Sequence, residues 1–401
     1  MGKAKQLGLA GFLTTAVAFG PARNGYGLFL PNIREEFGLS TVMLGFIASG
    51  LYAGYLAALL AVGLLAARAG PRLPVLIGLV SAGVGMGLVV LSPNIPSLAA
   101  GVILAGTSAG WSWAPYSDAV AQAVPQSSRD RVLSVVSTGT TFGIMAAGLI
   151  ALATGAWGLP WRAAWLAFSL ASFTVAAYNT WALTGGPLSS GRRGGEARWL
   201  GWSWFLRYGS APLFIVALSF GVVNAVYWSF AVDLLSRSGG SFLTSGPMLY
   251  AVLGVAGFVG LFTGDAVARF GLRRVLVAIQ AFLGVSVGLL GLAPASLPAT
   301  GVSAVLFGIG VMTMSALLSV WSSTVFLEQP STGFSAALFL FAIGNIAGSA
   351  ALGAFANSFG LEAAFLFTGA LALLTALVQP ARVSCPATAR SSSEDPSEPI
   401  P

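Results

Sequence analysis

The chain has very few residues that carry charge or acid–base chemistry. Only 8% of its 401 residues are charged, histidine is absent, and the single cysteine is Cys385. A soluble protein carries about a quarter of charged residues, whereas here 56% of residues are hydrophobic and the mean hydropathy is +0.85. Such a chain could not cover its own surface with polar groups in water. We therefore interpret it as an integral membrane protein.

The shortage of lysine and histidine excludes several functions. The two lysines, Lys3 and Lys5, both lie at the start of the chain. A P-loop needs an internal Gly-Lys-Ser/Thr sequence beneath the phosphates, so the chain is not a self-contained ATP-driven pump. An enzyme would need a nucleophile beside a base, or clustered metal ligands. The acidic residues are scattered along the chain, so we expect no catalytic site, no metal and no cofactor.

Long apolar stretches predict an all-α membrane protein. A helix needs about 20 apolar residues to cross the hydrocarbon core of a bilayer, and twelve stretches meet this requirement. The first is too long for the core of a signal peptide and no cleavage site follows it, so we expect it to be retained. The twelve stretches are 7–30, 41–64, 73–92, 97–121, 132–154, 161–183, 208–232, 244–266, 273–293, 298–322, 333–356 and 361–380.

The basic residues give an independent test of this topology. With both termini in the cytoplasm, three basic residues (Arg34, Arg162 and Arg237) fall in outside loops and Arg23 falls within the first span. The positive-inside rule predicts such an asymmetry, which also explains the basic pI without a nucleic-acid partner. The other fifteen of the 19 basic residues fall inside: Lys3, Lys5, Arg68, Arg72, Arg129, Arg131, Arg192, Arg193, Arg198, Arg207, Arg269, Arg273, Arg274, Arg382 and Arg390.

The longest polar interruption divides the chain in two. Residues 184–207 are polar and lie on the inside, and we interpret them as a cytoplasmic linker between six-helix bundles at 1–183 and 208–381. Residues 382–401 are polar and rich in proline, and we expect this tail to be disordered.

The two halves repeat each other with an offset of 201 residues. The offset aligns two Arg and two Gly of one inside loop with their equivalents in the other half, and also aligns Tyr26 with Tyr227. An even number of spans in each repeat gives both halves the same orientation, related by an axis along the membrane normal. The aligned loop residues are Gly63, Arg68, Gly70 and Arg72 with Gly264, Arg269, Gly271 and Arg273.

These loops resemble a motif of the major facilitator superfamily, G-x-x-x-D-R-x-G-R. The two copies read GLLAARAGPR (63–72) and GDAVARFGLR (264–273), with Ala67 and Ala268 at the position of the Asp. The segment GPARNGYGLFLP (20–31) resembles a first-span pattern of poorly characterised bacterial transporters. The resemblance implies twelve transmembrane helices in two parallel six-helix repeats.

The resemblance also implies a function. It implies a monomeric secondary transporter, active or facilitative, that moves a small organic solute across the bacterial inner membrane by alternating access. Because the chain has no histidine, a coupled proton would have to be carried by a carboxylate. Coupling to another ion, and uniport without a coupled ion, both stay open. The alternatives are efflux of amphipathic or neutral compounds of the drug or sugar type, and a non-transporting sensor on the same fold.

Arg23 is the most informative candidate for substrate binding. It follows Pro21, which lacks a backbone N–H and should kink the span. An intramembrane Arg costs roughly 2.5–3.5 kcal/mol even on a lenient scale, which makes it a functional candidate. If Arg23 faces a cavity, the parallel N–H donors of its planar guanidinium would suit a carboxylate. The alternatives are snorkelling to the interface and pairing with Asp233, which lies about 13 Å further along the axis.

Several polar and aromatic residues accompany Arg23. Tyr26 shares its helix face, and its mate Tyr227 lies between Asn224, the equivalent of Arg23, and Trp228. We expect the two tyrosines to hydrogen-bond an anionic substrate from both halves. The resemblance adds residues of the fourth and tenth spans to the cavity: Trp111, Trp113, Tyr116 and Trp321.

The resemblance places the gate residues at the inside loops. A carboxylate at Asp118 would pair with Arg72 and hold the inward gate shut; the alternatives for Asp118 are a solvated helix end and a proton site. Asp265 is followed four residues later by Arg269, a spacing that predicts a helical salt bridge. Asp233 and Glu328 lie at span ends, where we expect them at the membrane interface. The full set of gating candidates is Arg68, Arg72, Asp118, Asp265, Arg269 and Arg273.

Overall fold

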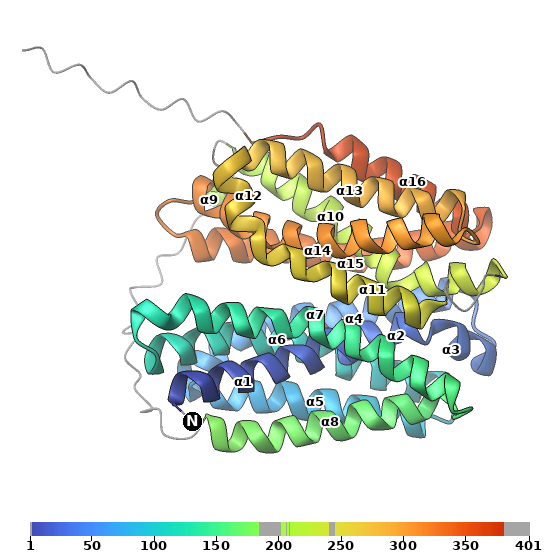
Figure 1. Cartoon of the computed structure of the whole chain (residues 1–401), viewed down its shortest axis with the longest axis horizontal. Coiled ribbons are helices and arrows are strands. Elements are labelled where there is room, and N and C mark those ends of the chain that lie inside the picture. The colour runs from blue at the N-terminus through green and yellow to red at the C-terminus, as the bar shows by residue number, and fades with distance from the viewer. Residues whose placement is uncertain (1, 184–201, 206, 208, 240–244, 381–401) are drawn as a thin grey trace, which may run out of the picture.

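The protein is helical throughout the part that the structure describes (Figure 1). The computed structural model describes residues 2–183, 202–205, 207, 209–239 and 245–380. Its elements are α1 (Lys3–Val17), η1 (Ala18–Ala22), α2 (Arg23–Leu28), α3 (Leu30–Phe37), α4 (Thr41–Ala69), α5 (Arg72–Leu91), α6 (Ile95–Ala123), α7 (Gln126–Ala156), α8 (Trp161–Ala182), α9 (Trp202–Phe205), α10 (Ser210–Arg237), α11 (Gly246–Gly257), η3 (Phe258–Phe262), α12 (Thr263–Phe270), α13 (Leu272–Leu292), α14 (Leu297–Val325), α15 (Pro330–Phe359) and α16 (Leu361–Thr375).

The first apolar stretch is broken where Pro21 was expected to kink it. Pro21 lies in η1, a single π-helical segment between α1 and α2. Because proline has no N–H to donate, the regular bonding of the helix fails there, and the Asn24 side chain donates instead to the Phe19 carbonyl at 2.7 Å. Pro21 thus coincides with a change of helix type, and Arg23 is the first residue of α2 after it.

Eight helical segments of the described chain are long and apolar enough to cross a membrane. They are α4, α5, α7, α10, the run from α11 to α12, α13, α14 and α15. The other expected spans fall short for separate reasons: the first is broken by η1, α16 has only 15 residues, and α6 and α8 are interspersed with Trp, Ser and Tyr. The count of twelve spans stays a prediction.

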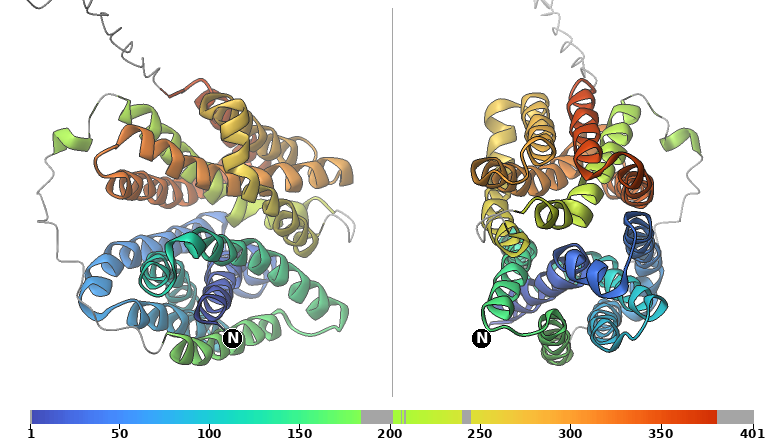
Figure 2. Two further views of the ribbon diagram at one scale, coloured as in Figure 1. Left: turned by 60° about the vertical axis from the view of Figure 1, so that its left-hand side comes forward. Right: turned by 90° about the vertical axis from the view of Figure 1, so that its right-hand side faces the viewer.

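The helices form two groups that lie side by side, α1–α8 and α10–α16 (Figures 1 and 2). One end of the molecule, here called the linker end, holds the start of α1 and the end of α8, which are joined by a bond from Lys3 Nζ to the Ala182 carbonyl. The opposite end holds α3 and the end of α10, and is called the α3 end. Apart from α9 and Arg207, most of the expected linker lies outside the described residues, as do the tail and Cys385.

The repeat has a counterpart in the packing of each half. A Cβ on Gly20 would lie 2.5 Å from the Gly143 carbonyl oxygen, and a Cβ on Gly221 would lie 2.9 Å from the Gly344 Cα. These four glycines are two pairs related by the offset of 201. In each half, the first long helix therefore touches the fifth at equivalent residues.

The two halves meet closely toward the α3 end. Gly27 of α2 packs so tightly on α10 that a Cβ there would overlap the Trp228 carbonyl oxygen. The Tyr250 hydroxyl of α11 donates to the Asn24 carbonyl at 2.8 Å, and the Ser49 hydroxyl of α4 donates to the Ile346 carbonyl at 2.8 Å. These contacts link α2, α4 and the helices of the second half directly through their backbones.

Candidate functional site

Arg23 lies inside a cage of aromatic rings. Its guanidinium carbon is 4.6 Å from the Tyr55 ring centroid, 5.4 Å from that of Tyr52, and 5.8 Å from those of Phe19 and Phe341. The residue is 9% exposed. We call these four rings the aromatic cage. Each ring face attracts the cation through its quadrupole, so the cage holds the positive charge without neutralising it.

The charge of Arg23 has no counter-ion in the described part of the chain. The ion pairs found there use other arginines, and the buried Nη2 atom of Arg23 has no hydrogen-bond partner. A guanidinium carries five N–H donors in a fixed plane. A buried donor that lacks a partner is costly, by roughly 1–3 kcal/mol and more for a charged group. Arg23 is thus prepared to bind an acceptor that the protein itself does not provide.

The cage is built from both halves of the molecule. Phe19 precedes Arg23 by four residues, and Tyr52 and Tyr55 lie three apart on one face of α4. Phe341 comes from α15 in the other half. None of the four rings was among the binding residues expected from the sequence. The spacing of Tyr52 and Tyr55 was a usable signal, but nothing local connects Phe341 with Arg23.

The surroundings of the cage toward the linker end are apolar. Tyr55 forms a small cluster with Ala109 and Ala342 that is separate from the main hydrophobic core. Further half-buried apolar side chains, among them Leu56 and Leu59, pack against this cluster. A molecule held by Arg23 would therefore have its remaining atoms beside apolar groups.

The two tyrosines expected to bind substrate use their hydroxyls within their own halves. The Tyr26 hydroxyl donates to the Leu44 carbonyl at 2.9 Å. The Tyr227 hydroxyl bonds the Ser303 hydroxyl at 3.0 Å, and its ring stacks on Phe307 with centroids 3.6 Å apart. In this state the structure does not bring Tyr26 and Tyr227 together around one acceptor.

Asn224, the repeat equivalent of Arg23, belongs to a buried amide network. Its Nδ2 donates to Asn345 Oδ1 at 2.6 Å, and its Oδ1 accepts from Trp228 Nε1 at 3.0 Å. Asn345 in turn donates to the Phe341 carbonyl at 2.7 Å. The network connects Asn224 and Trp228 to the backbone of a cage residue, so it fixes the position of Phe341.

The remaining aromatic candidates are dispersed. Trp321 is buried and Trp113 is 37% exposed, while Trp111 is half-buried against Gly78 of α5. Tyr116 is buried and hydrogen-bonds the side chains of Thr14 and Asn179 within the first half. None of these four rings belongs to the aromatic cage.

The gating candidates lie at the linker end. Their loops turn at glycines with positive φ, 71° at Gly70 and 80° at Gly271. Asp265 and Arg269 are not joined by an ion pair within the described residues, contrary to the spacing; Arg269 lies over the Phe270 ring at 5.4 Å instead. Asp118 is half-buried. The exposed candidates are Arg68, Arg72, Asp265, Arg269 and Arg273.

A second buried charge lies at the α3 end, where Asp233 of α10 is fully buried. Its carboxylate is 3.0 Å from Arg34 of α3 and 2.7 Å from Arg237 of its own helix. Arg237 also donates to the Thr41 hydroxyl of α4 at 3.3 Å. Asp233 lies near the end of its helix, as expected, but its carboxylate is buried beneath two guanidinium groups. We call Asp233, Arg34 and Arg237 the Asp233 clamp. Glu328, by contrast, is 72% exposed beside Arg207.

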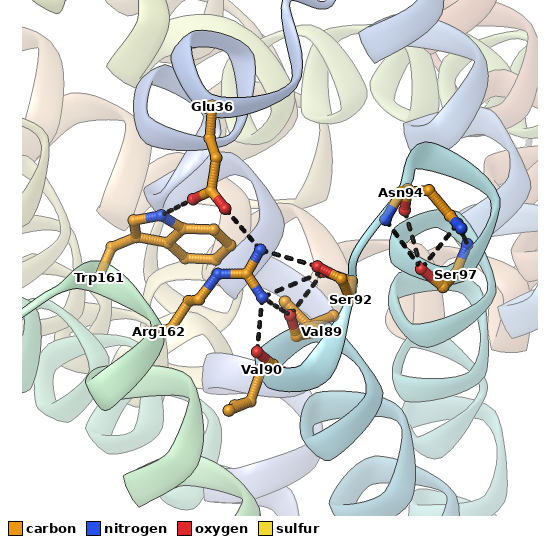
Figure 3. A network of polar contacts seen from close by, with 8 residues as sticks. All are labelled: Glu36, Val89, Val90, Ser92, Asn94, Ser97, Trp161 and Arg162. Carbon is orange, nitrogen blue, oxygen red and sulfur yellow. Dashed lines mark hydrogen bonds and ion pairs between the residues drawn. The ribbon is translucent and has the colours of Figure 1, made fainter.

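The helix that carries Arg34 is itself anchored by Arg162 (Figure 3). Arg162 of α8 forms an ion pair with Glu36 at 2.6 Å and donates to the Ser92 carbonyl at the end of α5 at 2.9 Å. The Trp161 indole also donates to Glu36, at 2.7 Å. The hydrogen bond from Arg162 holds the pKa of Glu36 below its ordinary value, against a smaller effect of burial. These bonds fix α3 to the first half.

A cavity of about 360 Å³ lies at the α3 end, lined by both halves. Phe29 and Trp161 line it from the first half, and Val232 and Leu235, which flank the clamp, line it from the second. It is separate from the aromatic cage, none of whose four rings lines it.

Residues 9–265, more than half of the chain, match the family model of the Major Facilitator Superfamily. The chain belongs to that superfamily. A bacterial homolog of the human lysosomal transporter Spinster, in an inward-facing and occupied conformation, is similar with a TM-score of 0.73 at 17% identity over 94% of this chain and 95% of that one. The nucleoside transporter NupG has a TM-score of 0.72 at 12% identity, covering 94% and 98%.

These likenesses show the fold. No curated protein matches the chain in sequence. Membership of the superfamily, together with the apolar helices, makes the chain a multi-pass membrane transport protein.

Proposed function

We propose that this superfamily member is a secondary active or facilitative transporter that moves a small organic anion across the plasma membrane by alternating access. The observation that carries the proposal is the buried Arg23 Nη2, which has no partner inside a cage contributed by both halves. An anion is the partner that this group lacks. A charge-assisted contact with a guanidinium is shorter and stronger than a neutral hydrogen bond.

The contacts between the halves support alternating access. At the α3 end the Asp233 clamp, the Gly27–Trp228 contact and the Tyr250–Asn24 bond join the halves. At the linker end the gating arginines are exposed. Arg23 lies between the two ends. We infer that the α3 end is shut in this state and that a substrate reaches Arg23 from the linker end.

The charge asymmetry supports an orientation. The fifteen basic residues predicted to lie inside include those of the linker end, so we propose that this end faces the cytoplasm and the α3 end faces outward. The state described would then open to the cytoplasm. Because the chain carries no ATP site, transport would be driven by a solute or ion gradient.

Ligand binding to purified protein tests the proposal. Because a ligand that binds only the folded state raises its apparent stability, a screen of organic anions by thermal shift would find candidates. We expect Arg23→Gln to weaken binding about ten- to a hundredfold, from roughly 1.5–3 kcal/mol. Arg23→Lys should also be impaired, since an ammonium cannot present the same fork. An uncharged ligand, or equal affinity in all three proteins, would show Arg23 to be structural.

Efflux of amphipathic neutral compounds is the second candidate, and the apolar groups beside the cage favour it. A neutral ligand would bind wild type and Arg23→Gln with equal affinity. Net flux in reconstituted liposomes separates both transport functions from a sensor, because a sensor would bind ligand without moving it.

A further inference from the structure

We infer that the anion bound at Arg23 carries a single negative charge on a flat apolar body, as an aromatic monocarboxylate does. This inference rests on the proposed function and specifies the chemical class of its substrate. The substrate class follows from three features: the charges that are buried, the apolar side chains beside the aromatic cage, and the contribution of Phe341 from the second half.

The number of buried charges limits the charge of the substrate. Arg23 and Asp233 are the charged residues that are buried in the described part of the chain. Asp233 is already matched by Arg34 and Arg237, so Arg23 alone is left with its charge unmatched. A second negative charge on the substrate would be buried without a partner, which is strongly unfavourable.

The same reasoning disfavours a zwitterion. The ammonium group of an amino acid would need a buried carboxylate near Arg23. Among the described residues the one fully buried acid is Asp233, which has two guanidinium partners at the α3 end, and the cage around Arg23 consists of aromatic rings. An amino-acid substrate would therefore bring its positive charge into a site that offers it no counter-ion.

The surroundings of the cage select an apolar body. Beyond the guanidinium, the neighbouring side chains toward the linker end are Phe19, Tyr55, Leu56 and Leu59. A polyhydroxylated body would lose hydrogen bonds to water there without gaining new ones. A flat ring can stack on or meet the edge of the cage rings, which stabilises aromatic pairs beyond the area they bury.

Phe341 closes the cage from the second half. Its backbone is held by Asn345, which is bonded in turn to Asn224. Because Phe341 moves with the second half, its ring reaches the Arg23 site only when the halves are close together. Phe341 therefore acts as a positioning residue that encloses the apolar body of the substrate during occlusion.

Four simple probes test the inference by thermal shift and by titration of the purified full-length chain. Benzoate carries one charge and a ring, benzamide has the ring without the charge, terephthalate has the ring with two charges, and acetate has the charge without the ring. We expect benzoate to bind at least tenfold more tightly than each of the other three. Arg23→Gln should abolish the preference for benzoate over benzamide.

The outcomes separate this inference from the proposed function. If terephthalate or acetate matches benzoate while Arg23→Gln weakens all carboxylates, the anion site stands and the inferred substrate class is wrong. If none of the carboxylates binds, or if benzamide binds as tightly as benzoate, the anion proposal itself fails.

A matched pair of phenylalanine variants tests the role of Phe341. We expect Phe341→Leu to weaken benzoate about three- to tenfold while acetate binding stays unchanged. Phe339→Leu, on the same helix but 40% exposed, should bind both like wild type. Equal weakening of benzoate and acetate in Phe341→Leu would show a structural role rather than contact with the ring of the probe.

Discussion

Arg23 and Asp233 are both buried, but their charges are matched in different ways. Asp233 has two guanidinium partners, Arg237 on its own helix and Arg34 from the other half, so it keeps both only while the α3 end is shut. Arg23 has ring faces around it and an unpaired Nη2. We interpret the ion pair between Asp233 and Arg34 as a gate contact, and the surroundings of Arg23 as a binding contact.

The clamp should appear as an energetic coupling between Arg34 and Asp233. Breaking a buried pair by removing one partner costs about 3–5 kcal/mol, and Arg34 is 27% exposed, so we expect the lower part of that range. Asp233→Asn should lower the melting temperature more than Arg34→Gln, because it breaks both pairs. The double variant should lose clearly less than the sum of the single losses. Additive losses would mean that the two residues do not interact.

Glu36 should make stability depend on acid pH. Its pKa is lowered in the fold, chiefly by the hydrogen bond from Arg162, so its contribution is present above the unfolded value near 4.5 and is lost as pH falls through the folded value. Since its side chain is 42% exposed, the contribution is about 1 kcal/mol at most. Thermal unfolding from pH 6 downward should show a shallower loss in Glu36→Gln than in wild type. Glu35→Gln, an exposed neighbour, should keep the wild-type slope, and equal slopes in all three proteins would contradict the assignment.

Sequence reasoning could select Arg23 because an arginine inside an apolar stretch is unusual in itself. It could not find the cage, because Tyr52, Tyr55 and Phe341 come from other helices and aromatic residues are common in membrane helices. It also did not pair Asp233 with Arg34. A carboxylate at a helix end is usually at the interface, and only the tertiary fold brings Arg34 over it.

Among the elements, α2 is the segment that joins the binding contact to the gate contact. It begins with Arg23, and Gly27 lies one turn later against the Trp228 carbonyl of α10. The Tyr250 hydroxyl also bonds the Asn24 carbonyl of this helix. Opening the α3 end would remove α10 and α11 from α2 and uncover the residues next to Arg23.

Gly27→Ala should therefore favour opening at the α3 end. The added Cβ would overlap a backbone oxygen, so the strain can be relieved only by moving α2 or α10. Gly25→Ala on the same helix is the matched control, because its Cβ would meet a Trp165 side chain at an ordinary 3.4 Å. Spin labels at Glu35 and Ser238, with Cys385 replaced, report the opening as a longer distance.

We expect a longer Glu35–Ser238 distance in Gly27→Ala and the wild-type distance in Gly25→Ala. If both variants, or neither, lengthen the distance, the Gly27 contact does not hold the gate.

Sequence patterns predicted the elements unevenly. The break at Pro21 could be predicted because proline removes a donor. The change from α11 to the 3₁₀ segment η3 has no proline to announce it. The break at Phe29 between α2 and α3 does have one, because Pro31 lies in the first turn of α3. Helix positions were easier to predict, since each long apolar stretch contains a long helix or a broken one, apart from the last, where α16 has only 15 residues.

At the scale of the whole molecule, the repeat explains how two similar bundles can move against each other. Equivalent glycine pairs pack the first helix of each half on the fifth, so each bundle has the same internal frame. The contacts between bundles are not equivalent: Arg23 faces aromatic rings, whereas Asn224 forms an amide network. This difference places the charged residue of the proposed anion site in the first half, and it could already be read from the aligned sequences.

Alternating access around Arg23 is tested by the side of the membrane from which the aromatic cage can be reached. A single cysteine at Leu56, beside Tyr55, in a Cys385→Ser background is treated with an impermeant thiol reagent from either side of sealed vesicles. A cysteine at Ser238 marks the α3 side. We expect Leu56→Cys to react from the side opposite to the one from which Ser238→Cys reacts. When Gly27→Ala is added, Leu56→Cys should react from the Ser238 side as well. Reaction from the same single side with and without Gly27→Ala would contradict alternating access around Arg23.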